Sequence, residues 1–573
     1  MQLLQQLIET ALGNCKADLV LKNASVFNVF TGSFSQGDVA VVGGYIAGVG
    51  EYSGHNELDL SGRYLTPGFI DAHVHIESSM VSPTQFARAV VPAGTTTVVA
   101  DPHEIANVLG SKGLQYMLDV TENLPLNVYI MLPSCVPATH LEHSGAILTT
   151  EELAEFMQHP RVLGLGEMMN YPGVLASSTD VLRKIALAKG KKIDGHAPGL
   201  TGKELTAYIA AGIQSDHECM TAEEARERLS QGMCVMLREG SAAKNLRDLL
   251  PAVTAHTMQQ CMFATDDRHP EDLTELGHIN HMVKLAVEAG VDAAWVLKMA
   301  TINAANYFGL SRLGAVAPGY RADLLVFEDL KEWRPVMVFK DGQLIAENGK
   351  AVFKAASVDE QAVENTVNLK SIEREKLKIA ANSSIARVIG LIPGQLATTM
   401  QELPVLIQNG EFVADPENDI LKLAVWERHH RTGRVGIGLL KGLGLKTGAM
   451  ASTIAHDSHN VVVVGANDED MLVAVRELER IQGGIIVVNR QKVLGALALP
   501  LAGLMSNNEI AQVRQELLQL QKLAWDQGIK AGYDPFMMLS FLSLPVIPAA
   551  KLTDAGLVDV RQFKLVPVSV EHS

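Results

Sequence analysis

Histidine and carboxylate residues close nearly every apolar run between residues 64 and 310. An isolated HxH pair such as His73-Val-His75 occurs by chance and means little by itself. The repetition is informative, because an apolar stretch has no structural need for such an ending. Burying many ionisable groups together costs several kcal/mol unless they are paired or ligate metal. The pattern therefore favours a metal site over isolated histidines that are hydrogen-bonded beneath loops.

The residue types at these run ends suit divalent cations. The candidate ligands are His73, His75, Glu167, His196, His217 and Asp266. Side chains alternate along a strand with period 2, so both imidazoles of the HxH motif point to one side and can ligate one ion. A carboxylate can bridge two cations. Imidazole and carboxylate donors without thiolate favour Zn, Mn or Fe(II).

The elements that position these residues alternate between strand and helix. Eight apolar runs, from YLTPGFIDAHVHIE to CMFATDD, are followed by amphipathic stretches of helical length. Such alternation implies a parallel sheet, and eight units in about 250 residues fit a closed barrel. The carboxyl ends of barrel strands converge on one face, so these distant residues can meet in one pocket. Residues 64–310 are therefore predicted to form a metal-dependent, TIM-like (β/α)8 catalytic barrel.

β-rich runs separated by Gly, Asn and Ser flank this barrel. Residues 1–63 and 311–360 together predict a small β-sandwich, with the barrel inserted between its two pieces. Polar residues then suit a linker, and a C-terminal α/β domain is predicted over residues 371–573. The predicted fold class is thus α/β throughout.

The C-terminal domain has two interpretations. It is a purely structural or oligomerising module, or it is a cover over the barrel mouth that excludes water from the reaction. The second interpretation starts from TIAHDSHN, where His456, Asp457 and His459 precede the apolar run VVVVGA. Loops on rigid scaffolds often carry function. It predicts that this loop faces the metal site.

Composition excludes several classes of protein. The 573 residues carry 48 Lys plus Arg against 64 Asp plus Glu, a net charge of −16. No Lys/Arg-rich run marks a nucleic-acid or anionic-membrane partner. Five scattered cysteines form no CxxC pair, which speaks against a zinc knuckle or a disulfide framework. With no signal-peptide pattern at its start and no apolar run of the ~20 residues that a membrane helix needs, the chain is expected to be soluble and cytoplasmic.

Other motifs are interpreted as structural. The i, i+3 histidine pairs HLEH (140–143) and HINH (278–281) are expected to be surface or helix-face histidines. No G-x-S-x-G is present, which argues against a serine hydrolase.

Longer strings of the chain are much more specific than the HxH motif. The block PGFIDAHVHIESSM, in a barrel flanked by split sandwich pieces, resembles the amidohydrolase superfamily. Within that superfamily the chain resembles the bacterial adenine deaminases in the strings DPHEIANVLG, GLGEMMNYPGV, DGHAPGLTGKELTAYIAAGI, REGSAAKNL and ATDDR. The resemblance covers essentially the whole chain, including TIAHDSHNVVVVGAND (453–468).

This resemblance implies a binuclear centre of Mn²⁺ or Fe²⁺ at the barrel mouth. The positions that match the family's ligands are His73, His75, His196, His217 and Asp266. Glu167 matches the carboxylate that bridges the ions where many relatives use a carbamylated lysine. The implied reaction is hydrolysis of adenine to hypoxanthine and ammonia in purine salvage, by a hydroxide that bridges the metals. A homodimer is expected.

Four residues are the candidate catalytic residues: Asp266, Glu77, Asp101 and His103. Asp266 would carry the proton of the attacking water. The other three would bind the purine ring or, alternatively, orient the ligand imidazoles. Two rival functions stay open at this point. One is an amidohydrolase that acts on another cyclic amidine or amide, and the other is a non-catalytic metal-binding barrel protein.

Overall fold

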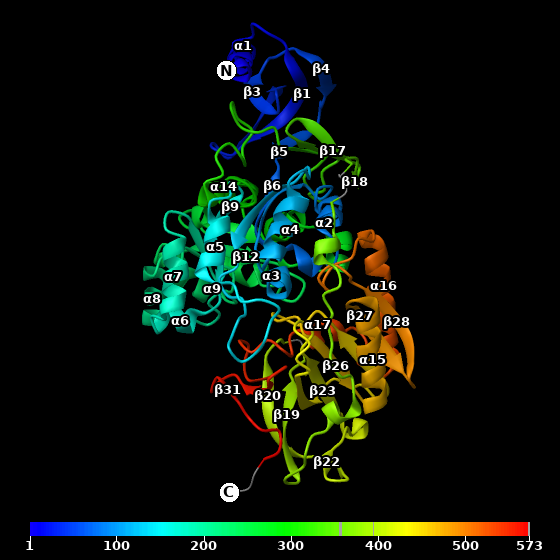
Figure 1. Cartoon of the computed structure of the whole chain (residues 1–573). Helices are drawn as coiled ribbons and strands as arrows, with labels where there is room; N and C mark the ends of the chain where they lie inside the picture. The colour runs from blue at the N-terminus through cyan, green and yellow to red at the C-terminus, as the bar shows by residue number, and fades with distance from the viewer. Residues whose placement is uncertain (355–357, 394, 571–573) are drawn as a thin grey trace.

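The computed structural model describes residues 1–354, 358–393 and 395–570. A small sheet at the N-terminal end, a barrel and a C-terminal sheet follow one another along the long axis of the molecule (Figure 1). Residues 355–357 belong to the predicted second sandwich piece, and 571–573 end the predicted C-terminal domain; both lie outside the described residues. The domain boundaries drawn from the sequence remain a proposal.

Strands from before and after the barrel form one nine-stranded sheet, in the order β18-β17-β16-β15-β5-β1-β2-β3 with β4 paired to β1. Antiparallel pairing of β5 with β15, with Leu65 opposite Val326, joins the two segments. Val26, Val39 and Phe339 contribute to a buried core on this sheet. The elements are α1 (Gln2–Ala11), β1 (Ala17–Asn28), β2 (Ser33–Val42), β3 (Tyr45–Gly50), β4 (Gly54–Asp59), β5 (Tyr64–Pro67), β15 (Leu324–Phe327), β16 (Met337–Lys340), β17 (Gln343–Glu347) and β18 (Lys350–Ala351).

Eight strands, β6 to β13, form the barrel. One hydrogen-bonded parallel sheet holds β6 to β10 and the short β14, and a second holds β11 to β13. The ring closes because β14, just beyond β13, pairs with β6, and because the Gln214 N–H donates to the Ile193 carbonyl between β10 and β11 at 3.0 Å. The strands are β6 (Phe69–His75), β7 (Thr95–Ala100), β8 (Asn127–Leu132), β9 (Val162–Met168), β10 (Lys192–Gly195), β11 (Ser215–Asp216), β12 (Cys234–Arg238), β13 (Cys261–Ala264) and β14 (Asp266–Asp267).

Every residue of β6 and β7 is buried, as in parallel strands that are covered on both faces. Helices between the strands supply the outer cover (Figure 1). They include α2 (Pro83–Val90), α3 (His103–Leu109), α4 (Ser111–Thr121), α5 (Thr150–Met157), α7 (Thr179–Leu187), α8 (Gly202–Ala210), α9 (Ala222–Ser230), α12 (Ile279–Glu288), α13 (Ala293–Met299) and α14 (Ile302–Phe308).

The C-terminal part is built on an eight-stranded sheet in the order β20-β19-β24-β23-β26-β25-β27-β28. Valines of β26 alternate between two cores: Val461 and Val463 pack with α15, whereas Val462 and Val464 join a core continuous with that of the barrel. The elements are β19 (Ile385–Leu391), β20 (Thr398–Pro404), β23 (Ile420–Trp426), β24 (Val435–Lys441), β25 (Ala449–Ser452), β26 (Val461–Gly465), α15 (Asp468–Ile481), β27 (Gly484–Asn489), β28 (Lys492–Ala498), α16 (Ile510–Asp526), α17 (Pro535–Ser540), β29 (Ala550–Thr553), β30 (Gly556–Asp559) and β31 (Lys564–Leu565).

Backbone hydrogen bonds attach the C-terminal part to the segment that leaves the carboxyl end of β6. The Ser82 N–H donates to the Ser506 carbonyl, and the Ser506 N–H donates to the Met80 carbonyl, each at 2.9 Å. The C-terminal part therefore packs beside the barrel mouth. The predicted α/β class, with a barrel between split β-rich pieces and a C-terminal α/β part, is confirmed. In the described ranges, no helix combines the length and apolar character needed to cross a membrane.

Candidate metal centre and active site

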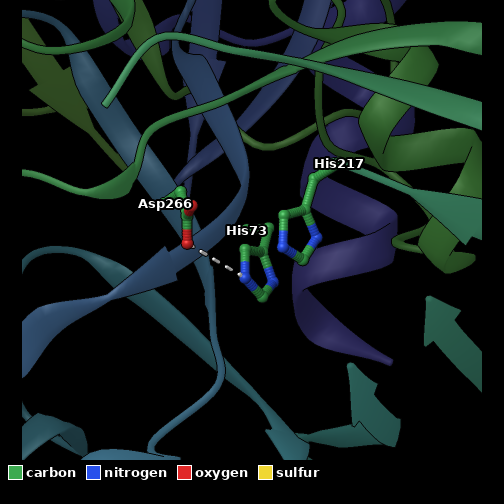
Figure 2. Close-up of side chains that lie close together, drawn as sticks. All are labelled: His73, His217 and Asp266. Atoms are coloured by element: carbon green, nitrogen blue, oxygen red, sulfur yellow. Dashed lines mark ion pairs between the residues drawn. The ribbon is translucent and has the colours of Figure 1, made fainter. Parts of the chain in front are cut away.

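The six candidate ligands all lie at the carboxyl ends of barrel strands. They are His73 and His75 in β6, Glu167 in β9, His196 after β10, His217 after β11 and Asp266 in β14. Figure 2 shows His73, His217 and Asp266 side by side at the barrel mouth, with a dashed line joining Asp266 to His73. The structure brings together every residue of this predicted set.

Glu167 occupies the centre of the cluster, and its two oxygens face different histidine pairs. Oε1 lies 3.9 Å from His73 Nε2 and 3.3 Å from His75 Nε2. Oε2 lies 2.6 Å from His196 Nδ1 and 3.3 Å from His217 Nε2. A carboxylate in this position can serve one cation with each oxygen.

Asp266 lies beside the first of these histidine pairs. We call His73, His75 and Asp266 the first half-site, and His196 with His217 the second half-site. Asp266 Oδ1 lies 3.6 Å from His73 Nε2 and 3.1 Å from His75 Nε2, while its Oδ2 accepts a hydrogen bond from Arg238 Nη1 at 2.9 Å. The residue has φ +59°, a left-handed conformation that Asp tolerates better than most residues. Arg238 therefore holds one oxygen, and the other faces the imidazoles.

The spacing of these atoms fits divalent metal. Nε2 of His73 and Nε2 of His75 are 3.1 Å apart and face carboxylates. Metal–nitrogen bonds of about 2.0–2.1 Å place tetrahedral neighbours about 3.3 Å from each other. Among the described residues, the buried Nδ1 atoms of His73 and His217 have no hydrogen-bond partner, so no contact seen there fixes the tautomer of either ring.

Electrostatics also favours positive charge here. Burial alone lowers the pKa of His196, but the Glu218 and Glu167 carboxylates outweigh it and raise this pKa to about 9. The second half-site thus attracts a cation strongly enough to protonate an imidazole. A divalent ion bound there can supply this positive charge instead, and the imidazole then stays neutral.

Asp101 and His103 support the cluster from the second strand end. Asp101 Oδ2 accepts from the Glu167 N–H at 3.0 Å, and its carbonyl oxygen lies 2.8 Å from His75 Nδ1. Nδ1 of His103 lies 3.2 Å from Glu167 Oε1. At Gly166 an added Cβ would lie 2.0 Å from Asp101 Oδ2, so only glycine admits this approach. These contacts favour an orienting role for both residues.

Glu77 is buried next to these residues. Its Oε1 accepts from the Ile105 N–H at 3.2 Å, and its buried Oε2 has no partner in the part of the chain that the structure describes. Burial raises the pKa of Glu77 to about 7, with a further contribution from the nearby Glu104 carboxylate. A carboxyl group that has one free oxygen and titrates near neutral pH is suited to exchange a proton or accept a hydrogen bond from a bound molecule.

Three charged residues outside the candidate ligand and catalytic sets also lie in this cluster: Glu104, Glu218 and Arg238. Arg238 pairs with Glu218 as well as Asp266, and Glu218 Oε1 lies 3.7 Å from His196 Nδ1. Glu104 Oε1 lies 3.4 Å from His103 Nε2. Arg238 ends β12, and Glu218 and Glu104 follow β11 and β7 within four residues, so their place at the ends of apolar runs was the available signal in the sequence.

The loop with His456, Asp457 and His459 lies at the barrel mouth. Both histidines contact Glu104, and all three side chains are buried. The prediction that this loop faces the metal site therefore agrees with its placement. The buried Oδ2 of Asp457 has no partner within the described ranges, and burial raises the pKa of Asp457 to about 6.

One interpretation of the histidine pairs is wrong. His278 of HINH is fully buried, not on a surface or a helix face. Its Nδ1 lies 2.8 Å from Thr95 Oγ1 and its Nε2 lies 3.1 Å from Asp71 Oδ2. It is the residue directly before α12. Asp71 in turn accepts from the His73 N–H at 3.2 Å, so His278 lies under a candidate ligand.

Comparison with known proteins agrees with this geometry. An amidohydrolase family model matches residues 64–345, and an adenine deaminase C-terminal domain model matches residues 395–564. Adenine deaminase 2 of Carboxydothermus hydrogenoformans is 64% identical over 570 residues, covering 100% of both chains. The adenine deaminases of Desulfatibacillum aliphaticivorans and Dehalococcoides mccartyi are 50% and 49% identical, each covering 98% of this chain and 99% of the relative. The chain belongs to the adenine deaminase family of amidohydrolases.

Proposed function

We propose that this protein hydrolyses adenine to hypoxanthine and ammonia at the barrel mouth. Water adds at carbon 6 of the purine, the exocyclic C–N bond breaks, and the amine leaves as ammonia. The observation that carries the proposal is the central Glu167, with one histidine pair at each oxygen, in a chain that matches adenine deaminases over its whole length. A non-catalytic metal-binding barrel would also assemble such a cluster, and the match to adenine deaminases over the whole chain is what favours the enzyme.

The residues that would hold the metal are those of the two half-sites. His73, His75 and Asp266 would serve one ion, His196 and His217 the other, with Glu167 shared between them. Two bound cations lower the pKa of water toward neutrality and so supply a hydroxide nucleophile without a strong protein base. We propose Mn²⁺ or Fe²⁺ for both positions, which suits a set of imidazole and carboxylate donors.

Asp266 would move the protons. Its Oδ1 faces the ligand imidazoles, where it can take the proton of the attacking water and later deliver it to the ring nitrogen or the departing amine. Arg238 holds Oδ2 and prevents the carboxylate from rotating away. Protonation of the leaving group is required, because ammonia rather than an amide anion must depart.

The direct test is turnover of adenine by metal-loaded protein. Incubation of the Mn²⁺-loaded chain with adenine is expected to shift the ultraviolet spectrum to that of hypoxanthine and to release ammonia. Elemental analysis is expected to give about two ions per chain, the number that binuclear catalysis uses. Chelation should remove most activity, and added Mn²⁺ should restore it. No turnover of adenine at full metal occupancy would refute the proposal, and turnover of a different cyclic amidine would favour that rival.

Glu77 and Asp101 are expected to separate in their kinetics. Glu77→Gln should lower kcat by about 10²-fold, the lower end of the range for general acid–base groups, with normal metal content. Asp101→Asn should instead lower metal content along with the rate, because the Asp101 carboxylate accepts from the N–H of Glu167, the central carboxylate of the cluster. Steady-state kinetics and metal analysis on the same samples test this. Identical metal content in both variants would contradict the orienting role of Asp101.

The remaining parts of the proposal concern the setting of the reaction. We also propose that the protein acts in purine salvage, is located in the cytoplasm and forms a homodimer. Adenine is the proposed small-molecule partner, with neither nucleic acid nor membrane.

A further inference from the structure

Glu104 at the start of α3 is held by two histidines from the C-terminal part of the chain. Its Oε1 lies 2.7 Å from His456 Nδ1, and its Oε2 contacts His459 Nε2. The three side chains are buried. The two histidines lie more than 350 positions from Glu104, so the contact exists only because the two parts of the chain pack together.

The two histidines are set up as donors. His459 Nδ1 accepts the N–H of Ala455 at 3.2 Å, which leaves Nε2 as the protonated nitrogen that faces Glu104. The ring of His456 stacks on Phe541, with centroids 4.4 Å apart and planes at 19°, and this fixes the direction of Nδ1. Each oxygen of Glu104 thus receives one fixed N–H.

The loop that carries these histidines is itself braced. The buried Arg428 donates Nε–H to the His459 carbonyl and Nη2–H to the Ala502 carbonyl, the latter at 2.9 Å. His429 Nε2 lies 2.8 Å from the Ser458 carbonyl. Because Arg428 donates its N–H groups to these carbonyl oxygens, it orders the backbone around it. The donors are therefore preorganised before any substrate binds.

Glu104 connects this loop to the metal cluster. Its Oε1 is 3.4 Å from His103 Nε2, and the other nitrogen of His103 is 3.2 Å from Glu167 Oε1. The path from the C-terminal loop to the central carboxylate thus passes through two side chains. A shift of Glu104 would displace His103 against Glu167.

We propose that His456 and His459, from the C-terminal part of the chain, are positioning residues for the deaminase reaction, which hold the Glu104 carboxylate beside His103 and thereby fix His103 against Glu167. The inference rests on the proposed function. The same trio also lies close enough to hold a metal ion. The protonated Nε2 of His459 disfavours that use, since a ligating nitrogen must be free of its proton.

Amide side chains give a matched test, because Asn places its nitrogen near the Nδ1 position of histidine and Gln near the Nε2 position. His456→Asn and His459→Gln retain a donor where Glu104 needs it, whereas His456→Gln and His459→Asn put the same group in the wrong place. The two misplaced variants are expected to lose about 10–100-fold in kcat, the typical cost of losing an outer-shell partner. The two matched variants should lose much less, and all four should keep the metal content of the wild type.

A double-mutant cycle checks that the effect passes through Glu104. In a Glu104→Gln background, His456→Gln should add little to the loss, since the group that His456 holds is already altered. His140→Gln, at an exposed histidine, controls for general effects of the replacement. Equal activity in matched and misplaced variants, or additive losses in the cycle, would overturn the inference. Three metal ions per wild-type chain would also overturn it, in favour of a cation site. Failure of the wild type to turn over adenine would instead refute the proposed function alone.

Discussion

Replacing Glu167 with Gln is expected to remove most of the activity and at least one of the two ions. Gln keeps the shape of the side chain but has one ligating oxygen and no charge, so it cannot serve both histidine pairs. The loss in kcat should exceed the roughly 100-fold that an outer-shell change costs, because Glu167 itself faces all four imidazoles. Elemental analysis and steady-state kinetics on the same preparation measure both effects.

Glu239→Gln provides a matched control for this experiment. Glu239 is also a buried glutamate just after a barrel strand, but its Oε2 accepts from the Leu246 N–H. We expect two ions and near-normal kcat in that variant. A Glu167→Gln protein that retains two ions would show that the carboxylate is not shared between them, and the binuclear assignment would need another bridging group.

The candidate ligands could be predicted from the sequence because barrel geometry makes the prediction simple. Once eight strands point the same way, the side chains at their carboxyl ends must meet, whatever their separation in sequence. Asp266 needed only its position at the end of the run CMFATDD. Which oxygen of Glu167 faces which histidine pair depends on side-chain rotation, and no periodicity in the sequence encodes that.

Contacts between the barrel and the C-terminal part were harder to predict from the sequence. The loop before β26 stood out because His456 and Asp457 precede an apolar run, but nothing in the sequence pairs it with Glu104. His278 was misjudged because i, i+3 spacing is typical of a helix face, and the helix in fact begins one residue later, at Ile279. In the structure His278 is buried and contacts Asp71. Tertiary packing decided both cases.

Asp266→Asn is expected to separate catalysis from metal binding. Asn keeps one oxygen that can take the ligand position of Oδ1, so most of the metal should remain. Its amide NH2 group then replaces Oδ2 and no longer accepts from Arg238. Asn cannot take the proton of the attacking water, and removal of such a group costs about 10²–10⁴-fold in rate. The loss in kcat should therefore exceed the loss in metal, when both are measured on one sample at several Mn²⁺ concentrations.

The neighbouring Asp267 gives the comparison for that result. Its Oδ1 accepts from Ser78 Oγ at 2.5 Å, so Asp267→Asn removes the same charge one position away without touching Arg238. We expect a smaller loss of kcat in this variant than in Asp266→Asn. If the activity of Asp266→Asn returns in full when excess Mn²⁺ restores its metal content, then Asp266 is a ligand alone. Another group facing the cluster, with Glu77 the first to examine because its pKa lies near 7, would then carry the proton.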